Sequence, residues 1–399
     1  MRETRLDFPM LDKDIIYLDN GATTFKPSSV LDTINDYYKN YSANAHRGDY
    51  SISYKVDVEY EKARKKVADF INADFEEVVF TSGTTESINM IVNGFFKNLL
   101  EPGDEVLLTK SEHASNVLPW FKLASTNNIN IKYIELDETL HVTIDNVRKA
   151  ISPRTKVISI AGITNVIGDA RPIDEICKLA HANDIFVVID GAQLVPHKHV
   201  DVKKSDIDFL AFSGHKMCGP TGIGVLYGKR EFLEKLDPVN LGGGMNESFD
   251  NEFEVVLKEL PTRLEAGTPN IAGAIGLGAA IDYLNSIGMD SIESHEKLLR
   301  QYLIDKLIKI PYIDIINLES ETGIVSFNID GIFSQDVAFY LNKYNICVRA
   351  GNHCAKILKN ETGVKNSLRV SLYFYNTYEE IDRLIDLLSD KERIKKEMI

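Results

Sequence analysis

Length, composition and charge exclude several classes of protein. The chain has 399 residues, of which 44% are hydrophobic, which is enough for two or three domains with buried cores. Its formal net charge of −14 argues against non-specific binding to nucleic acid or anionic lipid. No stretch of about 18 consecutive apolar residues occurs, and residues 1–14 lack the apolar run of a signal peptide. We therefore expect a cytoplasmic protein with no nucleic-acid or membrane partner.

The predicted strands begin near residue 77. Between residues 77 and 228, apolar β-branched runs alternate with amphipathic helical stretches, the pattern of a mostly parallel sheet. Apolar spacing in residues 173–180 predicts a crossover helix. The predicted strands are residues 77–81, 105–109, 131–136, 157–161, 186–189, 209–212 and 223–227.

After Pro261 the pattern changes to α+β. A helical region over residues 271–310 precedes short strands and a closing helix. The strands are predicted at residues 323–329, 346–349 and 367–372, and the helix at residues 378–389.

Glycines and a charged segment interrupt both patterns between residues 242 and 267, which places a domain boundary there. We expect an N-terminal segment, residues 1–15, that packs with the small domain. The large domain is predicted to span residues 16–262 and the small α+β domain residues 263–399.

The four cysteines show neither a disulfide framework nor a metal pattern. Cys177, Cys218, Cys347 and Cys354 contain no CxxC spacing and are too few for a secreted framework in so long a chain. We therefore expect no metal site. Cys354 differs from the others because it lies in a polar, glycine-containing stretch, residues 349–356, of the kind that exposes a reactive thiol.

An acid and a lysine follow two successive predicted strands. Asp190 comes directly after residues 186–189, and Lys216 follows residues 209–212. Because the carboxyl ends of neighbouring parallel strands open into one crevice, the two side chains are expected to meet there. Lys216 could hold an aldehyde as a Schiff base while Asp190 pairs with a protonated pyridine nitrogen, which indicates pyridoxal phosphate. A solvated surface lysine is the alternative.

Other polar residues follow strands at the same edge, and each has a second interpretation. Residues 81–87 could gather round a phosphate or form a helix N-cap. His113 could stack on a flat ring or bond within its loop. Asn165 could bond a ring hydroxyl or a substrate carboxylate, or form an Asx turn. Arg349 and Arg369 could bind a carboxylate in bidentate geometry or form surface ion pairs.

These residues belong to a collinear set of motifs that extends over nearly the whole chain. The motifs are residues 17–23, 45–48, 81–89, 112–113, 159–168, 190–193, 213–216, 263–270 and 348–355. As a set they resemble the class V aminotransferase family of fold-type I PLP enzymes, and within it the SufS-type (group II) cysteine desulfurases. The resemblance implies an α/β fold with a mostly parallel seven-stranded sheet in a large domain. A smaller α+β domain would carry the cysteine loop.

The resemblance also implies a cofactor, pyridoxal 5'-phosphate, held by Lys216 as a Schiff base. Asp190 would contact the pyridine nitrogen, Gln193 and Asn165 would lie near the ring, and His113 would stack on it. The phosphate would be held by Thr84, Thr85, Ser213 and His215, with Thr268 supplied by the partner subunit of a homodimer.

The implied reaction converts L-cysteine to L-alanine. Asn165 and Arg369 would bind the substrate carboxylate, with Arg349 close by. Lys216 and His113 would act with Cys354, whose thiolate takes the sulfur as a persulfide. Arg349 and His353 are the expected cationic neighbours of that thiol. The sulfur would pass to an acceptor protein for iron–sulfur cluster assembly.

The cysteine loop departs from the family pattern. Asn352 stands in place of the first histidine of Gly-His-His-Cys-Ala, and Lys356-Ile357 replace the pair that usually follows. Gln335 stands where relatives served by a zinc-bound SufU-type acceptor tend to carry histidine. The acceptor is therefore expected to be of either SufE or SufU type.

Two other functions remain as alternatives. A selenocysteine lyase, or another class V PLP enzyme, would suit the same residues, because cleavage of a Cβ–Se bond makes similar demands. A non-catalytic scaffold is the third hypothesis, and the presence of Lys216, Asp190 and Cys354 together argues against it.

Overall fold

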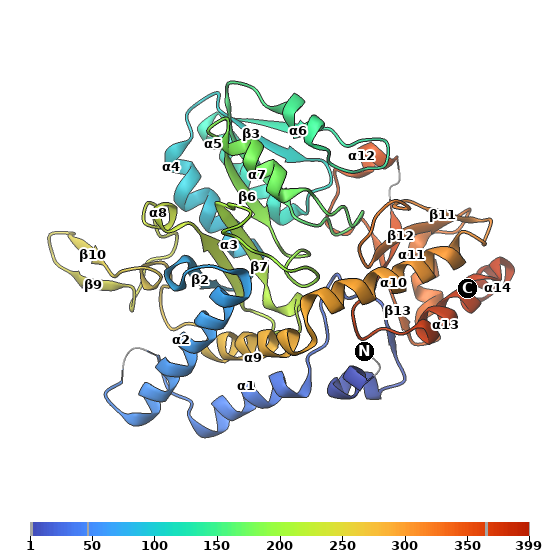
Figure 1. Ribbon diagram of the computed structural model, residues 1–399, viewed down its shortest axis with the longest axis horizontal. Coiled ribbons are helices and arrows are strands. Elements are labelled where there is room, and N and C mark those ends of the chain that lie inside the picture. The colour runs from blue at the N-terminus through green and yellow to red at the C-terminus, as the bar shows by residue number, and fades with distance from the viewer. Residues whose placement is uncertain (1–2, 46–47, 364–365, 399) are drawn as a thin grey trace.

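A seven-stranded sheet forms the centre of the molecule (Figure 1). The computed structural model describes residues 3–45, 48–363 and 366–398, and the strand order within them is β2-β8-β7-β6-β5-β3-β4. Neighbouring strands are parallel except where they pair with β8, which runs antiparallel to β2 and β7. The strands are β2 (Val78–Thr81), β3 (Glu105–Thr109), β4 (Asn130–Ile134), β5 (Thr155–Ala161), β6 (Phe186–Asp190), β7 (Phe209–Ser213) and β8 (Gly224–Gly228).

This sheet confirms the predicted α/β fold. All seven predicted strands are present, with ends displaced by at most two residues. Several strands extend one or two residues beyond the predicted apolar run, because backbone pairing continues through polar residues such as Thr155, Asp190 and Ser213.

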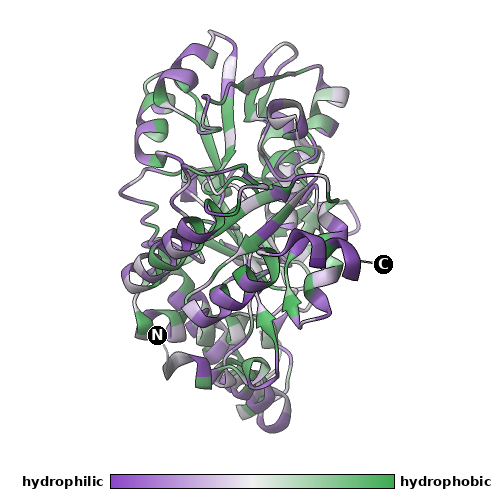
Figure 2. Ribbon diagram, turned by 90° about the vertical axis from the view of Figure 1, so that its right-hand side faces the viewer, coloured by the Kyte–Doolittle hydropathy of each residue, from purple (hydrophilic) through white to green (hydrophobic). Residues whose placement is uncertain are grey.

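Both faces of the sheet are buried at its centre, which explains why the inner strands are largely apolar. In β6, Val187 and Ile189 join one hydrophobic cluster and Val188 joins the other. Figure 2 shows hydrophobic residues concentrated on the inner strands and hydrophilic residues on the surrounding helices. Because side chains alternate between faces, a sheet covered on both sides needs an uninterrupted apolar run.

Helices cover each face. The first cluster receives side chains from α1 (Ser28–Asn40), α2 (Ser51–Ile71), α6 (Ile144–Ala150), α7 (Ile173–His181) and α9 (Ile271–Ile287). The second receives them from α3 (Thr84–Met90), its π-helical continuation Ile91–Phe96, α5 (Leu118–Asn127) and α8 (Arg230–Leu233); the short α4 (Lys97–Leu99) directly follows the π-helical turn.

The helical region predicted over residues 271–310 is two helices. Gly288, at φ 89°, separates α9 from α10 (Met289–Leu307), and the two axes meet at 72°. Across the residues that the structure covers, no single helix has the length and apolar character to cross a membrane; this bent pair meets the criterion by length and composition alone.

The C-terminal part contains a four-stranded antiparallel sheet, in the order β11-β12-β15-β14 within the described ranges. The predicted strand at residues 346–349 is divided between a parallel β1–β13 pair and this sheet. The strands are β1 (Ile16–Tyr17), β11 (Ile313–Ile315), β12 (Ile324–Ile329), β13 (Ile346–Cys347), β14 (Arg349–Gly351) and β15 (Ser367–Ser371). The helices are α11 (Ser334–Asn342), α12 (Lys359–Thr362), α13 (Tyr378–Leu388) and α14 (Lys391–Glu397).

The predicted domain limits stay a prediction, and two sets of contacts bear on them. Phe8 packs on Phe374 and Tyr375, and Arg5 forms an ion pair with Glu380, so the N-terminal segment contacts the C-terminal part. In contrast, the buried side chains of α9 join the core of the large sheet.

A two-stranded hairpin, β9 (Asn246–Phe249) and β10 (Val255–Leu257), projects from the body at the left of Figure 1. Its large apolar side chains Phe249, Phe253, Val255 and Val256 are exposed. No strand was predicted here, because the segment is charged and its apolar runs are short.

The turn between β2 and α3 lies directly against β8 at Gly224. A Cβ atom on Gly224 would lie 2.4 Å from Cα of Gly83 and 2.7 Å from the carbonyl oxygen of Phe212. Both are backbone atoms, which cannot move aside as a flexible side chain can. The absence of a side chain at Gly224 therefore lets the start of α3 reach the edge of the sheet.

We expect Gly224→Ala to destabilise the protein by about 1–3 kcal/mol, because the added methyl group overpacks against backbone. Urea unfolding followed by circular dichroism measures this. Gly242→Ala is the matched control, since its Cβ would meet nothing closer than 3.7 Å. Equal stability of the two variants would contradict the close approach.

Candidate active site

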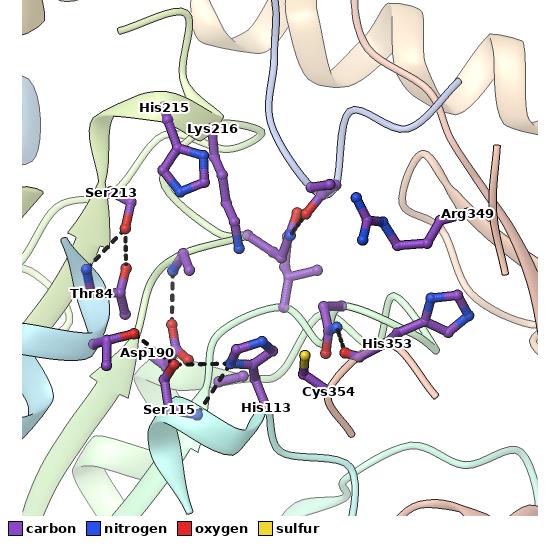
Figure 3. A pocket seen from close by; sticks show the side chains of 18 of the residues that line it. Thr84, His113, Ser115, Asp190, Ser213, His215, Lys216, Arg349, His353 and Cys354 are labelled. Carbon is purple, nitrogen blue, oxygen red and sulfur yellow. Dashed lines mark hydrogen bonds between the residues drawn. The ribbon is translucent and has the colours of Figure 1, made fainter. Parts of the chain in front are cut away.

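One cavity of about 320 Å³ lies at the carboxyl ends of the central strands and is closed on one side by the C-terminal part (Figure 3). Loops that follow β2, β3, β5, β6 and β7 each contribute side chains to it, as expected for a doubly wound sheet. The sequence-predicted site residues that line it are Thr84, Thr85, His113, Asn165, Asp190, Gln193, Ser213, His215, Lys216, Arg349, Cys354 and Arg369.

Lys216 and Asp190 lie in this cavity with complementary electrostatics. Burial lowers the pKa of Lys216 to about 8, although the Asp190 carboxylate opposes the shift. Burial also raises the pKa of Asp190 to about 6, against a hydrogen bond of 3.0 Å from the backbone N–H of Ala192. Burial therefore increases the fraction of Lys216 that is an uncharged amine near neutral pH, and this is the form that attacks an aldehyde.

Hydroxyl groups gather at the start of α3. The backbone N–H of Thr84 donates to Oγ of Ser213 at 2.9 Å, and the two hydroxyls lie 2.7 Å apart. The Thr85 hydroxyl pairs with Ser115, and the ring of His215 lines the same end of the cavity. The helix continues through its π-helical turn and α4 to Leu99, so its positive end faces these groups. This is an arrangement that binds anions.

His113 is uncharged in the cavity. Burial and the charges of Lys216 and Arg369 lower its pKa to about 4. Its Nδ1 accepts a hydrogen bond of 3.1 Å from the backbone N–H of Ser115, so the ring proton is on Nε2. The ring can therefore lie against a flat cofactor and donate a hydrogen bond from a fixed atom.

The loop that carries Cys354 is tied to two loops of the large sheet. The carbonyl oxygen of Cys354 accepts from the N–H of Ala114 at 2.9 Å, and that of His353 accepts from Nδ2 of Asn165 at 2.7 Å. Both His353 and Cys354 have positive φ, 49° and 58°, which costs energy for non-glycine residues. The thiol is exposed, and its backbone is fixed by the loops that hold His113 and Asn165.

The expected role of His353 as a cation beside the thiol is wrong. Burial lowers the pKa of His353 to about 4, and its Nε2 lies 3.1 Å from the carbonyl oxygen of Ser367. The ring is therefore neutral and serves to fix the loop. Arg349 remains the cationic neighbour of this loop.

Three buried polar atoms of cavity-lining residues have no hydrogen-bond partner among the described residues: Oδ1 of Asn165, Nδ1 of His353 and Nε of Arg369. Arg369 does donate from Nη1 to the carbonyl oxygen of Asn165 at 2.9 Å. Because native proteins seldom leave buried polar atoms unpaired, these atoms fit a ligand that supplies a carboxylate and a donor. The wall, the hydroxyl cluster and the lysine together fit an anionic cofactor with an aldehyde.

Comparison with known proteins agrees with this geometry. Residues 16–384 match the model of the family "Aminotransferase class-V". The chain belongs to the class V aminotransferase family. This confirms the class V resemblance drawn from the sequence motifs.

Relatives of this class V chain are named as cysteine desulfurases. It is 43% identical over 383 residues, 94% of each chain, to a probable cysteine desulfurase of Halalkalibacterium halodurans. It is 40% identical over 405 residues, 96% of this chain and 95% of the relative, to a cysteine desulfurase of Haloferax volcanii. The apo structure of a cysteine desulfurase from Thermococcus onnurineus superposes with a TM-score of 0.94 at 38% identity, covering 99% of this chain and 98% of the other.

Some motif residues lie away from the cavity. Thr268 is exposed, in the segment before α9, and does not line the cavity formed by the described residues. His46 and Arg47, in the motif at residues 45–48, are outside the described residues.

Sequence reasoning missed two residues of this class V site. Ser115 pairs with Thr85 and with the ring of His113, and Asp19 contacts both Arg349 and Arg369. Asp19 lies in a motif at residues 17–23 that was recognised but given no role. The two arginines had been predicted to bind a carboxylate, and Asp19 is such a carboxylate. It lies far from both in the sequence, so only the folded structure shows that they pair.

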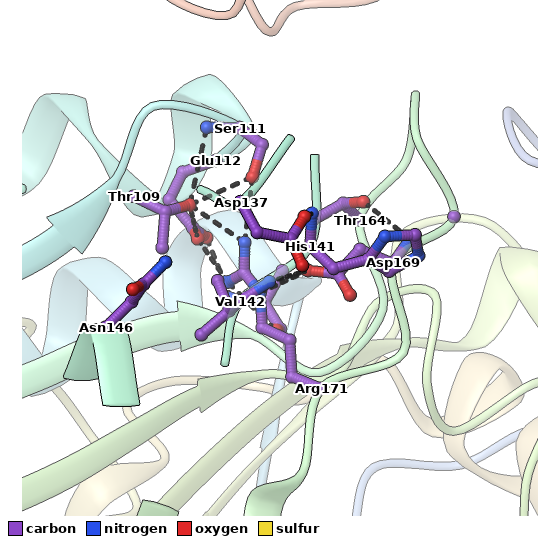
Figure 4. Close-up of polar contacts among 12 residues, drawn as sticks. Thr109, Ser111, Glu112, Asp137, His141, Val142, Asn146, Thr164, Asp169 and Arg171 are labelled. Carbon is purple, nitrogen blue, oxygen red and sulfur yellow. Dashed lines mark hydrogen bonds and ion pairs between the residues drawn. The ribbon is translucent and has the colours of Figure 1, made fainter. Parts of the chain in front are cut away.

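A buried ion pair supports the cavity from behind (Figure 4). Arg171 and Glu112 are both fully buried and bond to each other, and Arg171 also donates to Thr109 and Ser111. Glu112 directly precedes His113 and accepts from the N–H of Ala161 at 2.7 Å. The pair therefore joins the loop of His113 to the end of β5, from which the loop of Asn165 departs.

We expect Arg171→Met to destabilise this class V chain by about 3–5 kcal/mol, because it leaves the Glu112 carboxylate buried without its partner. Urea unfolding measures the change. Arg148→Met is the control, since Arg148 pairs with Asp145 on the surface and such pairs contribute about 0–1 kcal/mol. A loss below about 1 kcal/mol at Arg171 would show that the pair does not support the site.

Stability of the cofactor-free protein is expected to fall as pH falls from about 6.5 to about 4. His113, His215 and His353 all have pKa values lowered to about 4, chiefly by burial, so the unfolded chain takes up protons that the folded chain refuses. Burial raises the pKa of Asp190 to about 6 and raises that of Glu296, so these two acids act in the opposite direction, while a lowered pKa of His295 adds to the effect of the three histidines.

Urea midpoints measured between about pH 7 and pH 4 test this. The variant His215→Gln removes one titrating group and is expected to make the fall shallower. An unchanged slope in this variant would mean that His215 is not held neutral by the fold.

Proposed function

We propose that the chain is a PLP-dependent L-cysteine desulfurase of the SufS type, which transfers sulfur to Cys354 as a persulfide. The observation that carries the proposal is the exposed Cys354 thiol at a cavity that also contains Lys216 and Asp190. The names of the relatives support the same reaction.

The residues present suit pyridoxal 5'-phosphate. Lys216 would hold its aldehyde carbon, and Asp190 would accept a hydrogen bond from its pyridine N–H. Gln193 donates from Nε2 to the carbonyl oxygen of Gly21, which leaves its amide oxygen for the ring hydroxyl. The phosphate would lie against the start of α3, held by the groups Thr84, Thr85, Ser213 and His215. When bound, this cofactor withdraws electrons from the substrate carbons and so labilises the Cβ–S bond.

Residues of the C-terminal part would hold the substrate. Arg369 has a free Nε and Asn165 a free Oδ1, placed to take the α-carboxylate and the donor beside it. His113 would close the ring face and could offer a hydrogen bond from Nε2–H. Lys216, once released by the substrate amine, would move a proton between Cα and Cβ.

Cys354 would then take the sulfur. Its thiolate attacks the substrate sulfur, so an S–S bond forms as the Cβ–S bond breaks. The electron pair of the broken bond stays with Cβ, which is protonated to give the methyl group of L-alanine. The enzyme keeps a persulfide on Cys354, and no external oxidant or reductant is required.

We also infer a homodimer and an acceptor protein. Exposed Thr268 would reach the phosphate site of the partner subunit, and the exposed apolar hairpin β9–β10 suits burial against a second copy. Gln335 is exposed at the start of α11, and its Nε2 lies 4.0 Å from where a Cβ on Gly351 would be. An acceptor of SufE or SufU type that collects sulfur for iron–sulfur cluster assembly would meet Gln335 at this rim.

We expect the protein, incubated with L-cysteine and pyridoxal phosphate, to release L-alanine and to gain one sulfur atom on the peptide that contains Cys354. Mass spectrometry of non-reduced peptides locates the sulfur. Cys354→Ala should reduce alanine release to background, because no other described cysteine is both exposed and in the cavity.

Cys347→Ala is the matched control, since Cys347 is partly exposed and lies in β13. This variant should keep both the persulfide and the release of alanine. Full alanine release by Cys354→Ala in the presence of an acceptor would reject the persulfide mechanism.

A further inference from the structure

Two arginines of the cavity lie directly opposite each other across a pair of strands. Arg349 in β14 and Arg369 in β15 are register partners in the antiparallel ladder. The side chain of Arg369 is 2% exposed and that of Arg349 is 48% exposed. Like charges at directly opposed positions repel, so this pair needs an anion between its guanidinium groups.

Asp19 supplies that anion from a third chain segment. Its Oδ2 lies 2.8 Å from Nη2 of Arg349, and its Oδ1 accepts from Nη2 of Arg369 at 3.0 Å. Nε of Arg349 also donates to the same carboxylate. Asp19 therefore occupies the Nε–Nη2 edge of Arg349, whereas it takes a single hydrogen bond from Arg369.

Backbone pairing explains how the carboxylate reaches this position. The N–H of Leu18 donates to the carbonyl oxygen of Cys347, and the N–H of Ser371 donates to that of Leu18. Residues 18 and 19 thus lie between β13, which leads into β14, and the end of β15. The strand geometry inserts Asp19 between the two arginines.

The guanidinium of Arg369 is held on several sides. Nη1 donates to Asn165, Nη2 donates to Asp19, and a Cβ on Gly21 would lie 3.2 Å from Cζ. Arg369 also lines the cavity where the proposed function puts the substrate carboxylate, and its buried Nε has no hydrogen-bond partner among the described residues. Asp19 and a bound α-carboxylate would therefore share one guanidinium.

We propose that Asp19 is a positioning residue that serves as a resident counter-anion. It fixes both arginines between turnovers and weakens binding of the α-carboxylate, so that L-alanine leaves. Two carboxylates on one buried guanidinium repel each other strongly, and this repulsion outweighs the hydrogen bonds that Asp19 contributes to orientation. The proposal rests on the proposed function, since it concerns the substrate site of that reaction.

The test compares L-alanine with ethylamine, which differs from it only by lacking the carboxylate. Both are titrated into the PLP-loaded protein, and the change in cofactor absorbance gives each dissociation constant. We expect Asp19→Asn to bind L-alanine at least about tenfold more tightly than the wild-type protein does, with ethylamine changed less than about twofold. For L-cysteine, KM and kcat should both fall, because release of product becomes slower.

Asp12→Asn is the control, because Asp12 is an exposed acid of the same N-terminal segment. It should leave both dissociation constants unchanged. Equal or weaker binding of L-alanine by Asp19→Asn would overturn the inference alone. A wild-type protein that does not prefer L-alanine to ethylamine would overturn the substrate assignment and the inference together.

A second measurement does not depend on the cofactor. In the cofactor-free Asp19→Asn protein, Arg369 lacks its counter-ion, so sodium formate should raise the thermal midpoint more than sodium chloride does at equal ionic strength. The wild-type protein should show a smaller difference between the two salts. Equal responses of the two proteins would overturn the inference. If the variant is unstable, it can be purified in sodium formate before the test.

Discussion

The buried ion pair of Arg171 and Glu112 is the interaction on which the cavity depends. It joins the loop after β3 to the end of β5, and these loops place His113 and Asn165. Through hydrogen bonds, the same two loops hold the backbone of His353 and Cys354. A charge pair without solvent tolerates little displacement, because either partner alone would be strongly destabilising. One contact thus fixes the parts of the site relative to one another.

Burial sets the charges inside the cavity. His113, His215 and His353 stay neutral, whereas the arginines keep their charge because an acid or a carbonyl faces them. Positive charge is therefore carried by Lys216, Arg349 and Arg369, with the Asp19 carboxylate between the two arginines, and the neutral rings are available to stack. The carboxylate of an amino acid entering the cavity meets these few fixed charges rather than a diffuse field.

Much of the fold could be predicted from the sequence, because a sheet buried on both faces requires apolar runs that are easily recognised. Lys216 and Asp190 could be paired because both follow such runs. The partnership of Asp19 with two arginines could not, since it depends on how residue 18 pairs with β13 and β15. Burial changed the role of His353 from cation to neutral hydrogen-bonding group. The hairpin at Asn246–Phe249 and Val255–Leu257 carries too short and charged a pattern to be recognised as strands.

His353 and Cys354 have positive φ angles, and their carbonyl oxygens accept hydrogen bonds from Asn165 and Ala114. This anchoring affects how sulfur can be passed on. A thiol on a loop anchored at two points has little freedom to swing away from the cavity. The acceptor protein, rather than Cys354, must therefore move to bring the two sulfur-carrying groups together. A receiving protein would need a nucleophile on a projecting segment, long enough to reach the rim and narrow enough to enter it.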